Sequence, residues 1–177
     1  MSLPKLFDRE ITLKALSQVE AEGNYPSWLN DPIVTQFNSH GEKQYTKEMA
    51  KTYIDSVENS STHHVFAIMF INQHIGNISL QHIDKKSASA ELAILIGEPS
   101  MYGKGIGYRA SKLLFEYGFN VLQLHKIYCG TSEKNVSMQQ LALKLGMNEV
   151  GKSTRKLYKN NQYFDILEYS ILSSQYQ

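Results

Sequence analysis

The sequence predicts a single α/β domain built on a mixed, mostly antiparallel sheet with helices on both of its faces. Two observations lead to this prediction. Short apolar runs and amphipathic stretches alternate as one strand, helices, three strands, a helix, a strand, a helix and two strands, which makes seven strands. The chain also has 177 residues and 42% hydrophobic content, enough for one sizeable core but too few for two domains. We therefore expect one domain over residues 1–177.

The N-terminal part is predicted to supply a first strand and several helices. Residues 6–16 alternate between apolar and polar side chains, which favours a strand. A helical region over residues 19–30 is interrupted by Gly23 and Pro26, because both residue types disfavour a helix interior. Further on, Thr46 is suited to cap the next helix, since its hydroxyl can accept a hydrogen bond from the first helical turn.

Three strands joined by tight turns are predicted in the middle of the chain. Residues 64–71 form a continuous apolar run, which is typical of a central strand. A two-residue turn at 72–73 leads into a second strand over 74–83. Another turn at 85–87 leads into a third strand over 88–96. Two consecutive hairpins are therefore expected.

A glycine-rich turn and an amphipathic helix follow this third strand. Residues 102–107 read Tyr-Gly-Lys-Gly-Ile-Gly, and glycines at alternate positions let the backbone turn tightly and approach a ligand closely. With Lys104 and Arg109 nearby, the helix N-terminus predicts a phosphate site rather than a simple connection. The dinucleotide fingerprint is excluded because Tyr108 replaces its last glycine, and a Walker loop is excluded because Lys104 precedes no Ser or Thr. The apolar stripe of the helix comprises Ile106, Ala110, Leu113, Leu114, Tyr117 and Val121.

The C-terminal part completes the sheet. A strand over 125–131 follows the glycine-loop helix, and a strand, helix, strand connection implies a parallel pair with a right-handed crossover. Asn135 is expected to open another helix, which Gly146 stops. Two closing strands over 149–158 and 162–172 are expected to be joined by a turn of two asparagines.

Composition excludes several classes of partner. The net charge is +1, with 18 basic and 17 acidic residues in no long run, so we expect no nucleic-acid partner. No apolar stretch is long enough to span a membrane and no signal peptide is apparent, so we expect a cytoplasmic protein without a membrane partner. The single cysteine, Cys129, fits a reducing compartment and is expected in the core. His63 and His64 lack metal-ligand spacing, so no metal is expected.

Residues 99–107, Pro-Ser-Met-Tyr-Gly-Lys-Gly-Ile-Gly, resemble the acetyl-CoA loop of the GNAT N-acetyltransferase superfamily, whose pattern is Gln/Arg-x-x-Gly-x-Gly/Ala. The two family glycines fall on Gly105 and Gly107. Tyr102 takes the Gln/Arg position, as is common in the Rim-type branch that acetylates ribosomal-protein N-termini. The predicted element order also resembles the GNAT topology over nearly the whole chain. This resemblance implies a splayed central pair of parallel strands, and a homodimer paired through a sheet edge.

The resemblance further implies that acetyl-CoA is the co-substrate, with its pantetheine arm between the splayed strands. Backbone N–H groups about Ile96 and Gly97 would face the acetyl carbonyl, and Gly103 to Tyr108 would hold the pyrophosphate. Asn135 would bond the pantetheine arm or the substrate while also capping its helix. The expected cofactor-binding residues are Ile96, Gly97, Tyr102, Gly103, Lys104, Gly105, Ile106, Gly107, Tyr108 and Asn135.

Glu91 is the candidate general base, because it is a carboxylate in an otherwise apolar strand. The hairpin before it places it nearly opposite His82, so the two side chains should share one face of the sheet. The alternative is a purely structural Glu–His pair at the mouth of the sheet. A weak base suffices for an α-amino group, whose pKa is about 8, whereas a lysine amine, with a pKa of about 10.4, needs a stronger one.

The proton donor to the departing thiolate is where the family pattern breaks. Many GNAT enzymes carry a tyrosine seven residues after the asparagine that matches Asn135, and here that position is Ala142. Ser137 and Tyr158 are the replacement candidates. Because the pKa of a free thiol is about 8.5, CoA can leave as a thiolate with limited help.

Two residues are candidates for binding the acceptor. Trp28 lies in an aromatic-rich turn and either contacts the acceptor or is buried beneath a lid. Asp165 matches an acidic position common in the Rim-like branch, and either orients the acceptor amine or pairs across its hairpin. The expected acceptor is a small-molecule or peptide amine, with a protein N-terminus or an amino sugar ahead of a polyamine or an antibiotic. The rival function is a non-catalytic acetyl-CoA-binding module, which the missing tyrosine at Ala142 supports.

Overall fold

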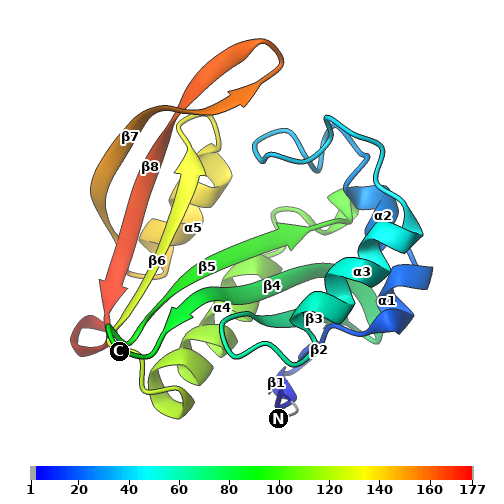
Figure 1. Ribbon diagram of the computed structural model, residues 1–177. Helices are drawn as coiled ribbons and strands as arrows, with labels where there is room; N and C mark the ends of the chain where they lie inside the picture. Colours follow the sequence, from blue (N-terminus) through cyan, green and yellow to red (C-terminus); the bar gives the residue numbers. More distant parts are fainter. Residues whose placement is uncertain (1–2, 177) are drawn as a thin grey trace.

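A computed structural model describes residues 3–176 and shows one mixed sheet with helices on both faces (Figure 1). The strands are β1 (Leu6–Asp8), β2 (Ile11–Ala15), β3 (His64–Phe70), β4 (Gln73–Asp84), β5 (Ser89–Ile96), β6 (Lys126–Ser132), β7 (Asn148–Lys159) and β8 (Gln162–Leu172). The helices are α1 (Gln18–Glu22), α2 (Tyr25–Trp28), α3 (Lys47–Val57), α4 (Ile106–Glu116) and α5 (Val136–Lys144). None of these helices is long and apolar enough to span a membrane.

The eight described strands lie in the order β1-β2-β3-β4-β5-β6-β8-β7, and every neighbouring pair is antiparallel except β5 and β6. The predicted fold class is confirmed, but the predicted count of seven strands is wrong. The first predicted strand folds back on itself, so that Asp8 pairs with Ile11 across a two-residue turn. Arg9 adopts φ +51° there. A positive φ is uncommon at an arginine, and the turn contains no glycine, proline or asparagine. Nothing in the local sequence therefore indicates a turn here.

The turns that contain asparagine lie at their predicted positions or one residue away. Asn160 and Asn161, with φ +51° and +59°, join β7 to β8 as expected. The turn between β3 and β4 consists of Ile71 and Asn72 rather than the predicted 72–73, because Gln73 already pairs with Phe70. Thr46 caps α3 as predicted, and its hydroxyl accepts from the backbone N–H of Met49 at 3.3 Å.

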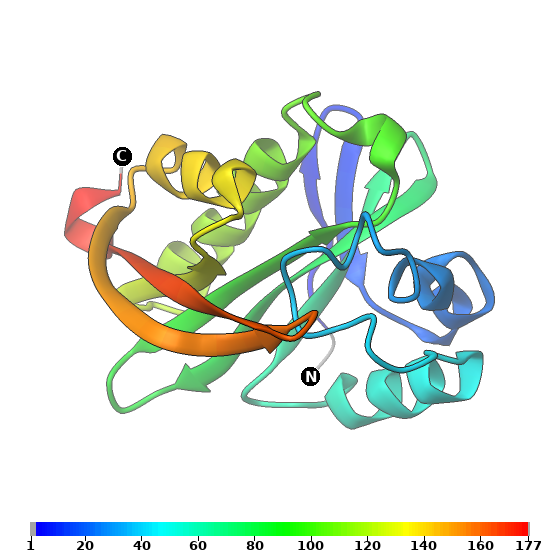
Figure 2. The ribbon, with the colours of Figure 1, turned by 90° about the horizontal axis from the view of Figure 1, so that it is seen from above.

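Two hydrophobic clusters pack on opposite faces of the sheet. Figure 2 shows α4 and α5 on one face of the sheet and α1 to α3 on the other. One cluster joins the helices α1 to α3 to Leu16, which follows β2, and to side chains of β3, with Leu95 of β5 beside it. The other joins α4 and α5 to the alternate side chains of β2 to β6 and β8. Residues Ala90 and Leu92 belong to this second cluster. Because side chains alternate along a strand, Glu91 points to the face that carries α1 to α3.

Helix α4 ends in a π-helical turn over Tyr117–Val121, which the sequence did not predict. A π turn holds more residues per turn than an α-helix, so it rotates the side chains that follow it. Val121, expected on the buried stripe, is instead 64% exposed, while Phe119 packs into the core. The rest of the predicted stripe, from Ile106 to Tyr117, faces the sheet.

Candidate active site

The sheet divides after the first residues of its central parallel pair. Only Ser89, Ala90 and Glu91 of β5 pair with β6, opposite Lys126, Ile127 and Tyr128. Beyond Glu91 the two strands diverge, and β5 stays paired with β4 while β6 stays paired with β8 (Figure 1). The edge of β5 from Leu92 to Ile96 therefore has no strand partner on the β6 side. An open edge of this kind can accept an extended group through backbone hydrogen bonds.

Of the two backbone N–H groups expected to face the acetyl carbonyl, those of Ile96 and Gly97, only the first points to this open edge. The N–H of Gly97 donates to the carbonyl of Ile75 at 2.8 Å, so it points toward β4 and is not available to an acetyl carbonyl. Because successive N–H groups of a strand point in opposite directions, the N–H of Ile96 points to the open edge. Here the expectation for Gly97 is wrong, and that for Ile96 remains a proposal. The Tyr102 hydroxyl donates to the Ile96 carbonyl at 3.1 Å, which places this side chain at the same edge.

The glycine loop beyond this edge is open to a ligand. Gly103 and Gly105 both adopt φ +73°, and nothing lies within 4 Å of where a side chain would begin on either residue. Gly105 caps α4, and its carbonyl accepts from Arg109, so the N–H groups of Ile106, Gly107 and Tyr108 precede the first helical hydrogen bond. These donors, together with the positive end of the helix dipole, form a site suited to a phosphate group.

The two cations near the loop are placed differently. Lys104 is exposed, with its Nζ 3.8 Å from the Met101 sulfur, and is free to approach a phosphate. Arg109 points away from the loop, because its guanidinium binds Asp8 at 2.6 Å and Glu10 at 3.1 Å. The hydrogen bond from Arg109 lowers the pKa of Asp8. Arg109 therefore ties α4 to the β1–β2 turn and is not positioned for a phosphate.

Glu91 and His82 meet as the sequence predicts. Glu91 Oε2 lies 2.9 Å from His82 Nδ1, with His82 in an irregular part of β4 at φ +50°. The Glu91 side chain is 31% exposed and that of His82 is 61% exposed, so solvent reaches the pair. Glu91 is also the last residue of β5 that pairs with β6. Its carboxylate thus lies where the two strands begin to separate, on the face that carries α1 to α3.

Tyr128, opposite Glu91 on β6, is a neighbour that the sequence did not reveal. Paired residues project to the same face, so its phenol shares the face of the Glu91 carboxylate. Burial raises the pKa of the Tyr128 phenol, and the nearby Glu91 and Asp84 carboxylates add to this effect. The parallel register that brings the two residues together cannot be read from local sequence patterns.

The candidate proton donors lie apart from Glu91 in the sequence and in the fold. Ser137 is exposed in the first turn of α5, and Asn135 caps that helix by accepting from the N–H of Met138 at 3.2 Å. Tyr158 is near the tip of the β7–β8 hairpin, where its hydroxyl contacts the Asn161 side chain at 3.3 Å. Ala142, at the position of the usual tyrosine, is fully buried in the core. The structure thus does not bring Ser137 or Tyr158 to the Glu91–His82 pair by any described contact.

Trp28 has a packing role in this structure. It is 4% exposed, its ring lies over Gly97, and its Nε1–H donates to Glu98 at 3.1 Å. The ring also lies 4.8 Å from that of His74. Of the two roles predicted for Trp28, burial beneath the surface is the one shown by these contacts. It joins α2 to the start of the glycine loop.

Asp165 pairs across its own hairpin. Its carboxylate binds Lys152 at 2.6 Å and accepts from the backbone N–H of Arg155 at 2.8 Å. The hydrogen bond from Lys152 lowers the pKa of Asp165. Asp165 also lies on the opposite face from Glu91, since its strand neighbours Leu167 and Tyr169 pack with the α4 and α5 cluster. These contacts account for Asp165 without an acceptor amine.

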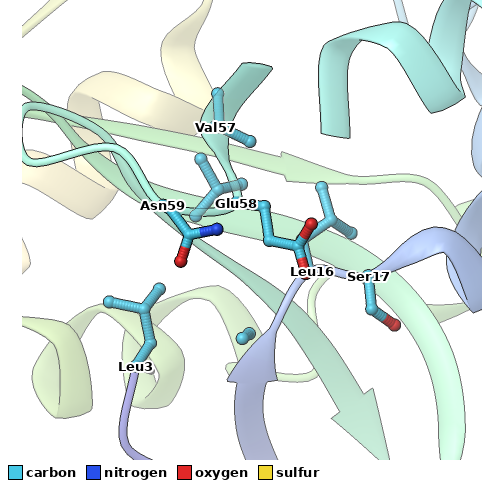
Figure 3. Close-up of a pocket in the computed structure, with 8 residues that line it drawn as sticks. Leu3, Leu16, Ser17, Val57, Glu58 and Asn59 are labelled. Carbon is cyan, nitrogen blue, oxygen red and sulfur yellow. The ribbon is translucent and has the colours of Figure 1, made fainter. Parts of the chain in front are cut away.

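Two cavities within residues 3–176 lie away from the open edge of β5. One of about 180 Å³ lies where β2 and α3 end and β3 begins (Figure 3), at the opposite end of the sheet from the glycine loop. The other, about 280 Å³, lies within the loop between α2 and α3, beside His40 and Gly41. Within residues 3–176, no three His, Cys, Asp or Glu side chains gather as ligands for a metal ion.

Comparison with known proteins agrees with this geometry. Spermidine N(1)-acetyltransferase from Escherichia coli is 30% identical over 129 residues, which cover 73% of this chain and 68% of that protein. A solved structure of spermidine N-acetyltransferase from Vibrio cholerae, in complex with CoA and spermine, superposes with a TM-score of 0.86. That match has 23% identity and covers 96% of this chain and 99% of the other, so it shows the fold alone.

A second solved structure is RimL, a ribosomal L7/L12 alpha-N-protein acetyltransferase in complex with coenzyme A. It superposes with a TM-score of 0.88 at 14% identity, and the match covers 96% of this chain and 98% of that one. The family model of the acetyltransferase (GNAT) domain matches residues 10–148 of the chain. The divided sheet, the open glycine loop and this match over most of the sequence together lead to one conclusion: the chain belongs to the GNAT acetyltransferase family.

Proposed function

We propose that the protein transfers an acetyl group from acetyl-CoA to a primary amine, with Glu91 as the general base. The observation that carries this proposal is the position of Glu91 at the point where β5 and β6 separate. A carboxylate there borders the open edge of β5 and faces the helices α1 to α3. A base can accept the proton of an amine at this point, directly or through a water molecule.

The glycine loop fits the pyrophosphate of acetyl-CoA. The open space at Gly103 and Gly105 leaves room for phosphate oxygens, and the first N–H groups of α4 supply donors to them. Lys104 adds a cation, and Tyr108 belongs to the same first helical turn. When bound, acetyl-CoA supplies the activated thioester that the amine attacks. The solved structures of two proteins with this fold contain CoA, which supports the assignment.

The open edge of β5 fits the part of the cofactor that leads to the thioester. The N–H of Ile96 is directed there, and a donor so placed stabilises negative charge that develops on an acetyl oxygen. Asn135 uses its side-chain oxygen to cap α5, which leaves its amide N–H groups to donate to the pantetheine arm. Ser137, in the first turn of the same helix, is the proposed donor to the thiolate, ahead of Tyr158 at the distant hairpin tip.

The acceptor class rests on charge and on relatives. Glu168 of β8 pairs with Gly130 of β6, so by register its side chain shares the face of Glu91. Two carboxylates on one face favour an acceptor with more than one positive charge, as in the spermidine acetyltransferases that the chain resembles. A polyamine is therefore the second candidate beside a protein N-terminus or an amino sugar, and dimerisation through a sheet edge remains part of the proposal.

A thiol-release assay tests this function. Acetyl-CoA is mixed with N-terminal peptides, amino-sugar nucleotides, spermidine and aminoglycosides, and release of free CoA is measured. We expect turnover with one class, and we expect Glu91→Gln to lower kcat by about 100-fold because the base is lost. Acetyl-CoA affinity, measured by calorimetry, should stay unchanged since Glu91 is not in the glycine loop.

The matched control is Glu58→Gln, which alters an exposed carboxylate at the end of α3 and should leave kcat unchanged. A Glu91→Gln enzyme with wild-type kcat would show that the Glu91–His82 pair is structural. Binding of acetyl-CoA without turnover on any amine would favour the non-catalytic module instead.

A further inference from the structure

Lys159, the last residue of β7, is a buried cation with an unusual set of partners. It is 6% exposed, and its Nζ donates to three backbone carbonyls, those of Thr35, Asn38 at 2.8 Å and His40 at 2.6 Å. An ammonium group has three donors, so these carbonyls satisfy it completely. Buried lysines are rare unless they are paired in this way. The contact is therefore a specific feature of the chain.

The three carbonyls belong to the loop between α2 and α3, which is folded to present them. The N–H of Thr35 donates to the Asp31 carbonyl at 2.9 Å, closing a turn at the start of the loop. Gly41 adopts φ +90°, and a side chain there would begin 2.5 Å from the Thr35 hydroxyl. The loop thus curls around the position of the Lys159 ammonium. It is separated from Lys159 by about 120 residues in sequence.

Lys159 joins the two halves of the divided sheet. The loop belongs to the half that holds β1 to β5, and the β7–β8 hairpin belongs to the half that holds β6 to β8. Figure 1 shows the hairpin tip and the loop on the same side of the molecule, beyond the point where β5 and β6 separate. Viewed from above, the hairpin reaches across to the loop (Figure 2). The region in which β5 and β6 are separated is therefore bounded by their paired residues at one end and by the Lys159 contact at the other.

We propose that Lys159 is a positioning residue that sets the space available to the acceptor amine. This inference rests on the proposed function, because it assumes that the acceptor enters on the face of Glu91. By holding the loop on the hairpin, Lys159 closes the space between the two halves of the sheet at the end remote from the parallel pair. This closure limits the length of the acceptor that fits beside Glu91, and the loop orients the end of the acceptor that is remote from the reacting nitrogen.

The test compares Lys159→Met with Lys159→Arg and with the control Lys156→Met. Methionine keeps the apolar stem but removes all three donors, arginine keeps a charge, and Lys156 is exposed on the same strand. The acceptor found in the panel and a series of linear diamines of increasing length serve as probes. For Lys159→Met we expect the acceptor KM to rise about tenfold and the preference for short diamines to weaken, since positioning is lost.

The KM for acetyl-CoA should stay within about twofold in Lys159→Met, since the glycine loop makes none of these contacts. The acceptor KM of Lys159→Arg should lie between those of Lys159→Met and the wild type. The KM values of Lys156→Met should match those of the wild type. A purely structural role would move both KM values together, or would lower thermal stability without changing length preference. Either result overturns the proposal.

Two further measurements keep the proposal testable if Lys159→Met does not fold. Gly41→Ala disturbs the loop alone through its positive φ, and it should shift acceptor KM and length preference in the same direction. Hydrogen exchange of residues 35–41 in the wild type should be slow if the contact holds the loop. Fast exchange there would overturn the inference even if the enzyme turns over. Absence of turnover with slow exchange would instead contradict the proposed function and leave the contact intact.

Discussion

Gly97 and the pair Gly103 and Gly105 lie only a few residues apart, yet the absence of a side chain serves opposite purposes. A side chain at Gly97 would begin 1.9 Å from the Trp28 ring, so this glycine makes room for another part of the protein. At Gly103 and Gly105 nothing lies within 4 Å, and both backbones adopt φ +73°. The space beside Gly97 is occupied by Trp28, whereas the space beside Gly103 and Gly105 is open, as the proposed phosphate site requires.

Within one loop, Gly97 thus serves stability, and Gly103 and Gly105 serve the proposed binding of a phosphate. Trp28 packs on Gly97 and donates to Glu98, which fixes the start of the loop to α2. Beyond that anchor the backbone is free to form a phosphate cradle. A count of glycines in the sequence does not distinguish these roles, whereas the space around each position does.

The largest effect is expected for Gly97→Ala. The new methyl group would overlap the Trp28 ring, which is buried and cannot move aside, so we expect a loss of about 3 kcal/mol in the free energy of unfolding. Urea denaturation measures this. The control is Gly23→Ala, where the nearest atom lies at 3.6 Å and φ is negative, and where we expect a change below about 0.5 kcal/mol. Equal stability of the two variants would break the comparison.

A smaller loss is expected for Trp28→Phe, which keeps a ring over Gly97 but removes the N–H donated to Glu98. The lost hydrogen bond and the smaller ring should together lower the free energy of unfolding by about 2 kcal/mol. Glu98→Gln is the control, because its amide oxygen still accepts from Trp28. If that variant were as unstable as Trp28→Phe, the charge of Glu98 and not the indole would be the anchor.

The smallest change in free energy is expected for Gly107→Ala, in the helical turn that follows the open part of the loop. A side chain there would make ordinary contacts, at 3.6 Å to Ile94 and 3.8 Å to Leu141, so stability should be unchanged. Acetyl-CoA affinity should also stay within about twofold, because the methyl group points to these two side chains and the acetyl-CoA loop pattern allows alanine at this position. Calorimetry with Gly23→Ala as reference measures it. A tenfold loss of affinity would show that the side of Gly107 facing Ile94 and Leu141 belongs to the phosphate site.

Local patterns predicted most of the elements. The hairpin turn at Asn160 and Asn161, the cap at Thr46 and the helix after the glycine loop all follow from short-range chemistry. The Glu91–His82 contact was also predictable, because a hairpin brings nearby residues of the sequence together. Errors within this set arose where the backbone departed from regular geometry, as at Arg9 and in the π turn before Leu122.

The rest depends on contacts between distant parts of the sequence. Arg109 was predicted to lie near a phosphate, but the fold brings Asp8 to its guanidinium. For Asp165 the sequence left two roles open, and the ion pair with Lys152 of the neighbouring strand shows the pairing across the hairpin. Lys159 sits in an ordinary alternating strand, and nothing nearby in the sequence marks it as buried. A local sequence pattern indicates which chemical groups a side chain has. The fold determines which other residues bind those groups.

The buried position of Cys129 has a practical consequence for measuring any of these reactions. Its sulfur packs 3.9 Å from that of Met147, and burial raises the pKa of the thiol to about 12. It is the only cysteine in the chain, so a thiol reagent added to the folded protein should detect released CoA without a background from the enzyme. The same reagent would react with the chain once it unfolds. One colour reaction therefore reports turnover in the native state and loss of that state when the protein is denatured.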